Sequence, residues 1–287
     1  MLCCIGDLVE DVIVWPAAEL IHGTDTPARV FRRRGGSAAN AAVIAVREGQ
    51  PSRFVGQVGD DSLGTMLAAA MEQAGVDVVL ARGGTTGSIV VIVDQTGERT
   101  MLPDRSAATE LASLPAGALD GVTWLHVPAY SLIVEPLGAT TRTAIDTARQ
   151  RDIPVSIDAS STGPLSDFGV DGFLDMMRSI EPDVFFCNKD EAELLNIDSH
   201  SPLGGAGLTV IKAGADPVVI VDRDGNAIEI PVPTVAAVAD TTGAGDAFAA
   251  GFLSATLDGA APADAAIAAN RVAATVLLRP GAGSHNH

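Results

Sequence analysis

The sequence predicts an α/β fold with a mainly parallel central sheet, helices on both of its faces and a small separate β-sheet. Three observations support this prediction. Short β-branched or apolar runs alternate with helical stretches, two segments break that alternation, and 47% of the 287 residues are apolar, which is enough for one large core. We therefore expect one α/β domain over residues 1–287, and the composition argues against a disordered chain.

The alternation starts with the apolar stretch MLCCIGDLVEDVIVW. We interpret it as a first strand, because it lacks the basic start of a signal peptide and reaches Asp7 early. The later strand-like runs are RFVGQVG, VTWLHVP, PVSIDAS, DVFFCN, LTVIKAG and PVVIVD, with helical stretches such as LGTMLAAAMEQAG between them. Parallel strands need crossover helices of this kind, so the active site is expected beyond the carboxyl ends of the strands.

Two segments, 12–34 and 87–103, lack helical periodicity and contain strands joined by turns; in the second, Asp94 and Gly97 supply the turn chemistry. Although they are distant in sequence, we expect them to pair as a discontinuous β lid over the main domain. Edge strands of the main sheet are the alternative. Pairing of two lids would bury their apolar faces, so a homodimer is expected.

The composition also argues against several classes of protein. A formal net charge of -18 repels nucleic acids and anionic membranes, so we expect neither as a partner. Three cysteines are too few for a disulfide framework and are interpreted as reduced thiols, while the scattered histidines do not predict a zinc site. The sequence lacks a window of about 18 uninterrupted apolar residues, and we expect a cytoplasmic protein.

A glycine-rich turn precedes a small-residue helix in DTTGAGDAF, residues 240–248. Gly243 and Gly245 let the backbone approach a ligand closely, and the free amides at a helix start favour an anion. Asp246 falls in the first helical turn, where it is either a plain helix-start acid or a group of the active site. The chain has no GxxxxGK[ST] pattern, and GAGDAF lacks the third glycine of GxGxxG, so the phosphate site must be of another kind.

A second glycine pair, Gly35 and Gly36, ends a strand-like run and places Asn40 on the first turn of an Ala-rich helix. With this element the sequence resembles the ribokinase-like, or PfkB, family of sugar and nucleoside kinases over nearly its full length. The matching stretches, in the family's order, are IGDLVEDVIV, GGSAAN, VGQVGDDSLGTMLAAAMEQAGVD, NKDEAE, VIKAG, DTTGAGDAF and AIAANRVAATV.

The resemblance implies a three-layer ribokinase-like fold with a small β-sheet lid. It also implies an ATP-dependent carbohydrate kinase that transfers the γ-phosphate to a sugar hydroxyl, which is a phosphotransferase with an alcohol group as acceptor. The implied cofactors are ATP and Mg²⁺, with K⁺ in members that have a monovalent-cation site.

Roles follow from the resemblance position by position. Asp246 matches the general base, and the backbone amides of Gly243, Ala244 and Gly245 match the anion hole. The remaining matches are Asp11, Gly35, Gly36 and Asn40 for sugar hydroxyls; Asn188, Lys212, Gly214 and Asn270 around the nucleotide; Glu191 for Mg²⁺ through water; and Asp240 and Thr242 for a monovalent cation.

The chain departs from the family pattern at two positions. Pro217 stands where members commonly have a second glycine of the nucleotide turn, which weakens the assignment of the adenine pocket around residues 212–217. Val9 stands where ribokinase has an asparagine, so one hydrogen bond to a ribose-like acceptor is missing.

Arg105, in LPDRSAATEL, is a further candidate for the acceptor pocket. Its guanidinium can bind a carboxylate with two hydrogen bonds, so a sugar acid remains a candidate acceptor. The other interpretation is a surface residue paired with Asp104 or Glu110. We interpret the basic run 32–34 as a solvated strand face, with contact to a substrate phosphate or carboxylate as the alternative. Asp158 ends a strand and either lines the site or caps a helix.

The leading prediction is therefore a sugar kinase. The alternatives are a kinase for a sugar acid such as 2-keto-3-deoxygluconate or for a nucleoside, and a non-catalytic sugar- or nucleotide-binding regulator. Asp246 and its glycine turn argue against the regulator, because loss of the base would be the simplest route to an inactive protein.

Overall fold

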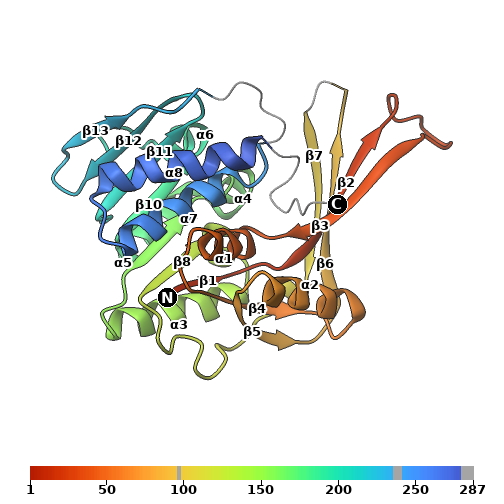
Figure 1. Cartoon of the computed structure of the whole chain (residues 1–287), viewed down its shortest axis with the longest axis horizontal. Helices are drawn as coiled ribbons and strands as arrows, with labels where there is room; N and C mark the ends of the chain where they lie inside the picture. The colour runs from red at the N-terminus through yellow and green to blue at the C-terminus, as the bar shows by residue number, and fades with distance from the viewer. Residues whose placement is uncertain (96–97, 235–240, 279–287) are drawn as a thin grey trace.

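A central sheet with helices on both faces makes up the main body of the structure (Figure 1). The computed structural model describes residues 1–95, 98–234 and 241–278. In these ranges the sheet has nine strands in the order β13-β12-β11-β10-β9-β8-β1-β4-β5. Their bounds are β1 Leu2–Ile5, β4 Ser52–Val58, β5 Asp77–Arg82, β8 Trp124–Pro128, β9 Val155–Asp158, β10 Val184–Asn188, β11 Leu208–Ala213, β12 Asp216–Asp222 and β13 Ala227–Ile230.

The strands of this sheet are parallel except for β12 and β13, which extend one edge as antiparallel neighbours. The helices that connect and cover them are α1 Ser37–Arg47, α2 Ser62–Gln73, α3 Leu137–Gln150, α4 Thr162–Phe168, α5 Val170–Ile180, α6 Lys189–Leu194, α7 Ala244–Leu257 and α8 Pro262–Leu277. The predicted mainly parallel sheet with crossover helices is therefore confirmed.

Alternate residues of β1 belong to different halves of the hydrophobic core. Leu2 and Cys4 are buried with residues of α1, α2, α7 and α8 on one face of the sheet. Cys3 and Ile5 are buried with residues of α3, α4, α5 and α6 on the other face. Successive side chains of a strand point to opposite faces, so this central strand has to be apolar throughout, and the result is three layers. Cys3, Cys4 and Cys187 are all buried and free.

A second, four-stranded sheet stands at one side of the main body (Figure 1). Its described strands, in the order β3-β2-β6-β7, are β3 Ala28–Gly35, β2 Val9–Pro16, β6 Thr86–Val93 and β7 Arg99–Ser106. It consists of two antiparallel hairpins joined by a parallel pairing of β2 with β6. The segments predicted to form a lid thus make a separate sheet, and the alternative that they are edge strands of the main sheet is wrong. We call this sheet the lid.

The two sheets are connected where the site is expected. The chain leaves β1 at Ile5 and enters the lid at Val9, and it returns from β3 directly into α1 through Gly35 and Gly36. Gly97, predicted to help form the β6–β7 turn, lies outside the described residues. No described helix combines the length and the apolar character that crossing a bilayer requires.

Candidate active site

Asp246 lies in the first turn of α7, directly after a glycine turn. Gly243 is the N-cap residue and has φ 75°, a left-handed conformation that glycine adopts without a Cβ penalty. Ala244 donates its amide to the Thr241 carbonyl at 3.2 Å, whereas no backbone carbonyl of the described residues accepts the amides of Gly245 and Asp246. The helix start therefore presents free N–H groups beside the Asp246 carboxylate, as an anion site requires.

The start of α1 holds the Asp246 carboxylate from the other side. Ser37 donates its hydroxyl to Oδ1, and Asn40 donates its side-chain amide to Oδ2 at 2.8 Å. Arg34, the last side chain before the double glycine, donates to the Asn40 carbonyl oxygen at 2.9 Å. This last bond fixes the Asn40 amide with its NH₂ group toward the carboxylate.

Ser37 and Arg34 contact the candidate site, and the sequence analysis did not assign either of them to it. The expectation of a solvated basic run is met by Arg32, whose side chain is 65% exposed and pairs with Glu10, but it is wrong for Arg34. Burial lowers the pKa of Arg34 to about 10, with the neighbouring Arg47 acting in the same direction, so the guanidinium stays charged at neutral pH. The one available signal for Ser37 was its place next to Gly36 in the shared GGSAAN element.

The environment of Asp246 favours a carboxylate that can take up a proton. Burial raises its pKa, and the hydrogen bonds from Ser37 and Asn40 act in the opposite direction. Asp158 raises the pKa further, while Lys212 lowers it. A carboxylate with a raised pKa is a better proton acceptor for a hydroxyl group than one with an ordinary pKa.

The double glycine is required by the close approach of two aspartates. Gly36 has φ 102°, and a Cβ on it would overlap the backbone carbonyl of Asp7. A Cβ on Gly35 would overlap the carboxylate of Asp11. The predicted sugar-binding positions Asp11, Gly35 and Gly36 are therefore packed together, next to Asn40.

Arg105 reaches the same region from β7, but its charge is already compensated. It donates to both carboxylate oxygens of Asp7, at 2.5 and 2.6 Å, and to the Tyr130 carbonyl at 3.1 Å, and its guanidinium lies 5.5 Å from the centre of the Tyr130 ring. The pair with Asp104 or Glu110 is not formed. Because Asp7 occupies the bidentate face, Arg105 is a poor receptor for a substrate carboxylate.

The predicted nucleotide side forms a second polar group at the ends of β9, β10 and β11. Asn188 and Glu191 make a reciprocal cap of α6: the Asn188 side chain accepts the Glu191 amide at 2.9 Å, and the Glu191 carboxylate accepts the Asn188 amide at 2.7 Å. Lys212 donates to Asp158 at 2.7 Å, with side chains only 13% and 9% exposed.

The two groups meet at the glycine turn. A Cβ on Gly245 would lie 3.5 Å from Nζ of Lys212, so the ammonium lies beside the free amides at the start of α7. Asp158 both lines this site and closes a local turn, since it also accepts the Ser160 amide at 3.0 Å. The arrangement places the Asp246 carboxylate, the helix-start amides and the Lys212 ammonium together, which suits transfer of an anionic group to a hydroxyl.

Comparison with known proteins identifies the family. The sequence model of the pfkB family carbohydrate kinases matches residues 1–287. The chain belongs to this family. It is accordingly a phosphotransferase with an alcohol group as acceptor.

The kinase has relatives among fructokinases. It is 30% identical over 268 residues to a fructokinase from Klebsiella pneumoniae, covering 87% of this chain and 82% of the relative. It is also 30% identical over 279 residues to a fructokinase from Salmonella typhimurium, covering 91% and 85%.

Solved structures confirm the ribokinase-like fold of the kinase. An adenosine kinase from Sinorhizobium meliloti superposes with a TM-score of 0.86 at 22% identity, covering 99% of this chain and 95% of that one. A putative ribokinase II from E. coli gives a TM-score of 0.84 at 18% identity, with 98% and 94% covered.

The remaining predicted positions of the kinase that the structure describes are Gly214, Asn270 and Thr242. Gly214 is exposed in the β11–β12 turn with φ 65°, and Asn270, 6% exposed, donates to the Pro231 carbonyl at 3.3 Å. Thr242 accepts a hydrogen bond from Arg99 of the lid. Asp240 lies outside the described residues, so the monovalent-cation site at Asp240 and Thr242 stays a prediction.

Glu191 should make the stability of the kinase depend on pH. Burial, together with Asp158, raises the pKa of Glu191 from 4.5 to about 7. The folded state thus keeps a proton that the unfolded state releases near pH 4.5, so this contribution to stability is full below that pH and is lost as the pH rises through about 7.

Glu191→Gln should remove this decline from the free energy of unfolding measured by urea between pH 5 and 8. Glu193→Gln, an exposed change on the same helix, is the control; equal pH slopes in all three proteins would refute the assignment.

Proposed function

We propose that the protein transfers the γ-phosphate of ATP to a hydroxyl group of a sugar, with Asp246 as the general base. The observation that carries the proposal is the Asp246 carboxylate at the free amides of α7, held by Ser37 and Asn40. The fructokinase relatives support a sugar as the acceptor.

In the proposed reaction the acceptor hydroxyl lies against Asp246 and displaces one of the bonds from Ser37 or Asn40. Asp246 accepts the hydroxyl proton as the oxygen attacks the γ-phosphorus, and the bond from phosphorus to the leaving oxygen of ADP breaks. The amides of Gly243, Ala244 and Gly245 stabilise the negative charge on the transferred group, for which Ala244 gives up its bond to Thr241, and the Lys212 ammonium lies close enough to add to this effect.

The acceptor itself is assigned to the floor of the lid. Asp11 and Asn40 offer a carboxylate and an amide to sugar hydroxyls, and Gly35 and Gly36, which lack a Cβ, let Asp11 and Asp7 pack against this floor. Arg105 is assigned a positioning role, because it anchors Asp7, whose carbonyl lies against Gly36.

On the nucleotide side, Glu191 and Asn188 suit contact with Mg²⁺ through bound water and not as direct ligands. Both carboxylate oxygens of Glu191 already accept hydrogen bonds from Asn188, and no described cluster of three or more His, Cys, Asp or Glu residues could hold a metal ion. Mg²⁺ bound mainly by ATP phosphates and water, with Glu191 and Asn188 ordering that water, agrees with this donor set. When bound, the ion would neutralise charge on the phosphates.

A homodimer formed through the lid is part of the proposal. Val30 and Leu102 are 53% and 54% exposed on the lid face opposite to Asp11. Burial of such a sheet face against a second copy would remove this apolar area from water. Nucleic acid and membrane are not proposed as partners, because the net charge of -18 opposes both.

ADP release with an acceptor panel tests the function. With ATP and Mg²⁺ present, we expect release to depend on a sugar such as fructose or ribose and to stop when the metal is chelated. If ADP is released only with nucleosides, the proposed acceptor changes from a sugar to a nucleoside. Binding of ATP without release for any sugar, sugar acid or nucleoside would contradict the proposal and favour a regulator.

A further inference from the structure

We infer that Arg33, with Arg29 beside it, binds an anionic group of the acceptor, a carboxylate or a phosphate. The inference rests on the proposed function and narrows its acceptor from any sugar to a sugar acid or a sugar phosphate. It moves the expected anion receptor from Arg105, which Asp7 neutralises, to the β3 strand of the lid.

Arg33 faces the same space as the acceptor-binding Asp11. In the antiparallel pairing of β2 with β3, Arg33 is directly opposite Asp11, and the next pairs along the hairpin are Phe31 with Ile13 and Arg29 with Trp15. Directly paired residues share one face of a sheet, with Cα atoms about 5 Å apart. An acceptor whose hydroxyl group meets Asp11 therefore has Arg33 within the length of one sugar.

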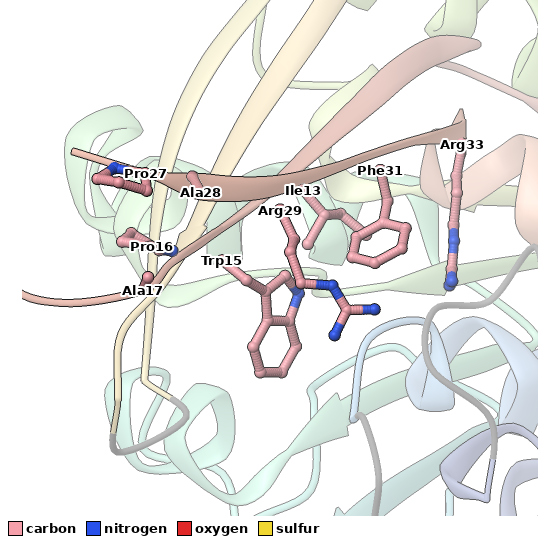
Figure 2. Close-up of a pocket in the computed structure, with 9 residues that line it drawn as sticks. All are labelled: Ile13, Trp15, Pro16, Ala17, Pro27, Ala28, Arg29, Phe31 and Arg33. Carbon is pink, nitrogen blue, oxygen red and sulfur yellow. The ribbon is translucent and has the colours of Figure 1, made fainter. Parts of the chain in front are cut away.

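A cavity extends from this point along the hairpin. It has a volume of about 610 Å³, and Figure 2 shows the side chains of Trp15, Arg29, Phe31 and Arg33 on the same side of the two strands. Arg29 is held 5.3 Å from the centre of the Phe31 ring. The cavity is large enough for the anionic end of an acceptor, and its apolar walls reduce the screening of charge by water.

Arg33 is the basic side chain of this face that needs a partner. Within the part of the chain that the structure describes, its Nη1 nitrogen is buried and has no hydrogen-bond partner. The adjacent arginines do have acceptors, Glu10 for Arg32 and Asn40 for Arg34. A buried charged donor without an acceptor is costly, and a carboxylate or phosphate oxygen would satisfy it.

The charge of the protein points to the same ligand class. A net charge of -18 repels anions, so an anionic acceptor needs cations placed at the site. A neutral sugar whose hydroxyl groups meet Asp11 would bring no negative charge to the buried Nη1 nitrogen of Arg33. A guanidinium offers only donors, in a planar arrangement that matches carboxylate and phosphate oxygens.

The test compares ADP release with fructose, fructose 1-phosphate, fructose 6-phosphate and 2-keto-3-deoxygluconate. The measured quantity is the ratio of kcat/KM for each anionic acceptor to kcat/KM for fructose. We expect the wild type to prefer one anionic acceptor, and the identity of that acceptor separates phosphate from carboxylate. Arg33→Met should lower the preference about 10- to 100-fold, because a charge-assisted hydrogen bond to the anion is lost.

Arg32→Met is the matched control, since it removes the same charge from the same strand but on the opposite face. It should change the ratio less than about 3-fold, although it lowers the melting temperature by leaving the buried Glu10 without its partner. Arg29→Met should have an intermediate effect because Arg29 is exposed.

Two results would overturn the inference while leaving the function intact. In the first, the wild type shows a kcat/KM for fructose that equals or exceeds its kcat/KM for each anionic acceptor. In the second, Arg33→Met and Arg32→Met change the ratio of kcat/KM values equally. If the protein releases no ADP with any of the acceptors, the proposed function fails. Calorimetric titration of the protein with the same anionic compounds then tests whether Arg33 binds an anion. Binding weakened in Arg33→Met alone supports it, and equal or absent binding in both proteins contradicts it.

Discussion

Asp246→Asn is expected to lower kcat by about 10² to 10⁴ while ATP and the acceptor still bind. Asparagine keeps the size of the side chain and a partner for Ser37, but its amide cannot take the proton of an attacking hydroxyl group. Steady-state ADP release gives kcat, and calorimetric titration of ATP and of the acceptor gives the two affinities.

Asp264→Asn provides the control for the competing interpretation of Asp246 as a helix-start acid. Asp264 is an exposed first-turn acid of α8, so its replacement removes the same favourable interaction with a helix dipole at a different helix. We expect normal kcat and a slightly lower melting temperature. If the two variants behave alike, or if Asp246→Asn turns over at a near-normal rate, Asp246 is not the base.

Lys212→Met is expected to lower the free energy of unfolding by about 3–5 kcal/mol at pH 7.5, the range for removing one member of a buried ion pair. Lys212 bonds Asp158 at 2.7 Å, and both side chains are nearly inaccessible to water. Burial lowers the pKa of Lys212, but Asp158 and Glu191 raise it more, so the net pKa is raised and the ammonium persists. Methionine would leave two buried carboxylates without their cation.

The loss in Lys212→Met should shrink as the pH falls through about 7, because protonation of Glu191 removes one of the two unpaired charges. Urea unfolding at pH 5.5 and 7.5 measures both values. Lys189→Met is the control: its side chain is 73% exposed and lies 4.0 Å from Asp216, so it should change stability by less than about 1 kcal/mol. A loss of similar size for both lysines would contradict the buried pair.

The fold was predictable where the signal is local. Alternation of apolar strands with helices fixes a parallel sheet, and the absence of helical periodicity in 12–34 and 87–103 predicts a separate lid. The two segments were expected to pair, but the parallel register of β2 with β6 was not predictable, because its partners, such as Glu10 and Ser88, are 78 positions apart and neither segment specifies the alignment.

The candidate site was predictable to a similar extent. Gly243, Gly36 and the Asn188–Glu191 cap depend on local conformation, so their patterns are visible in the sequence. The partner of Arg105 is Asp7, 98 positions away, and only the folded chain brings them together. Arg34 was misassigned for a related reason: three consecutive arginines look equally solvated, but alternation along β3 and the turn into α1 give each a different environment.

The most direct test of the catalytic role of Asp246 is a crystal structure with ADP, aluminium fluoride and an acceptor that supports ADP release. We predict that an Asp246 carboxylate oxygen lies within about 3.2 Å of the reacting hydroxyl oxygen, with the fluoride group on the amides of Gly243, Ala244 and Gly245. A reacting hydroxyl oxygen far from Asp246, with the carboxylate still bound to Ser37 and Asn40 alone, would contradict the mechanism.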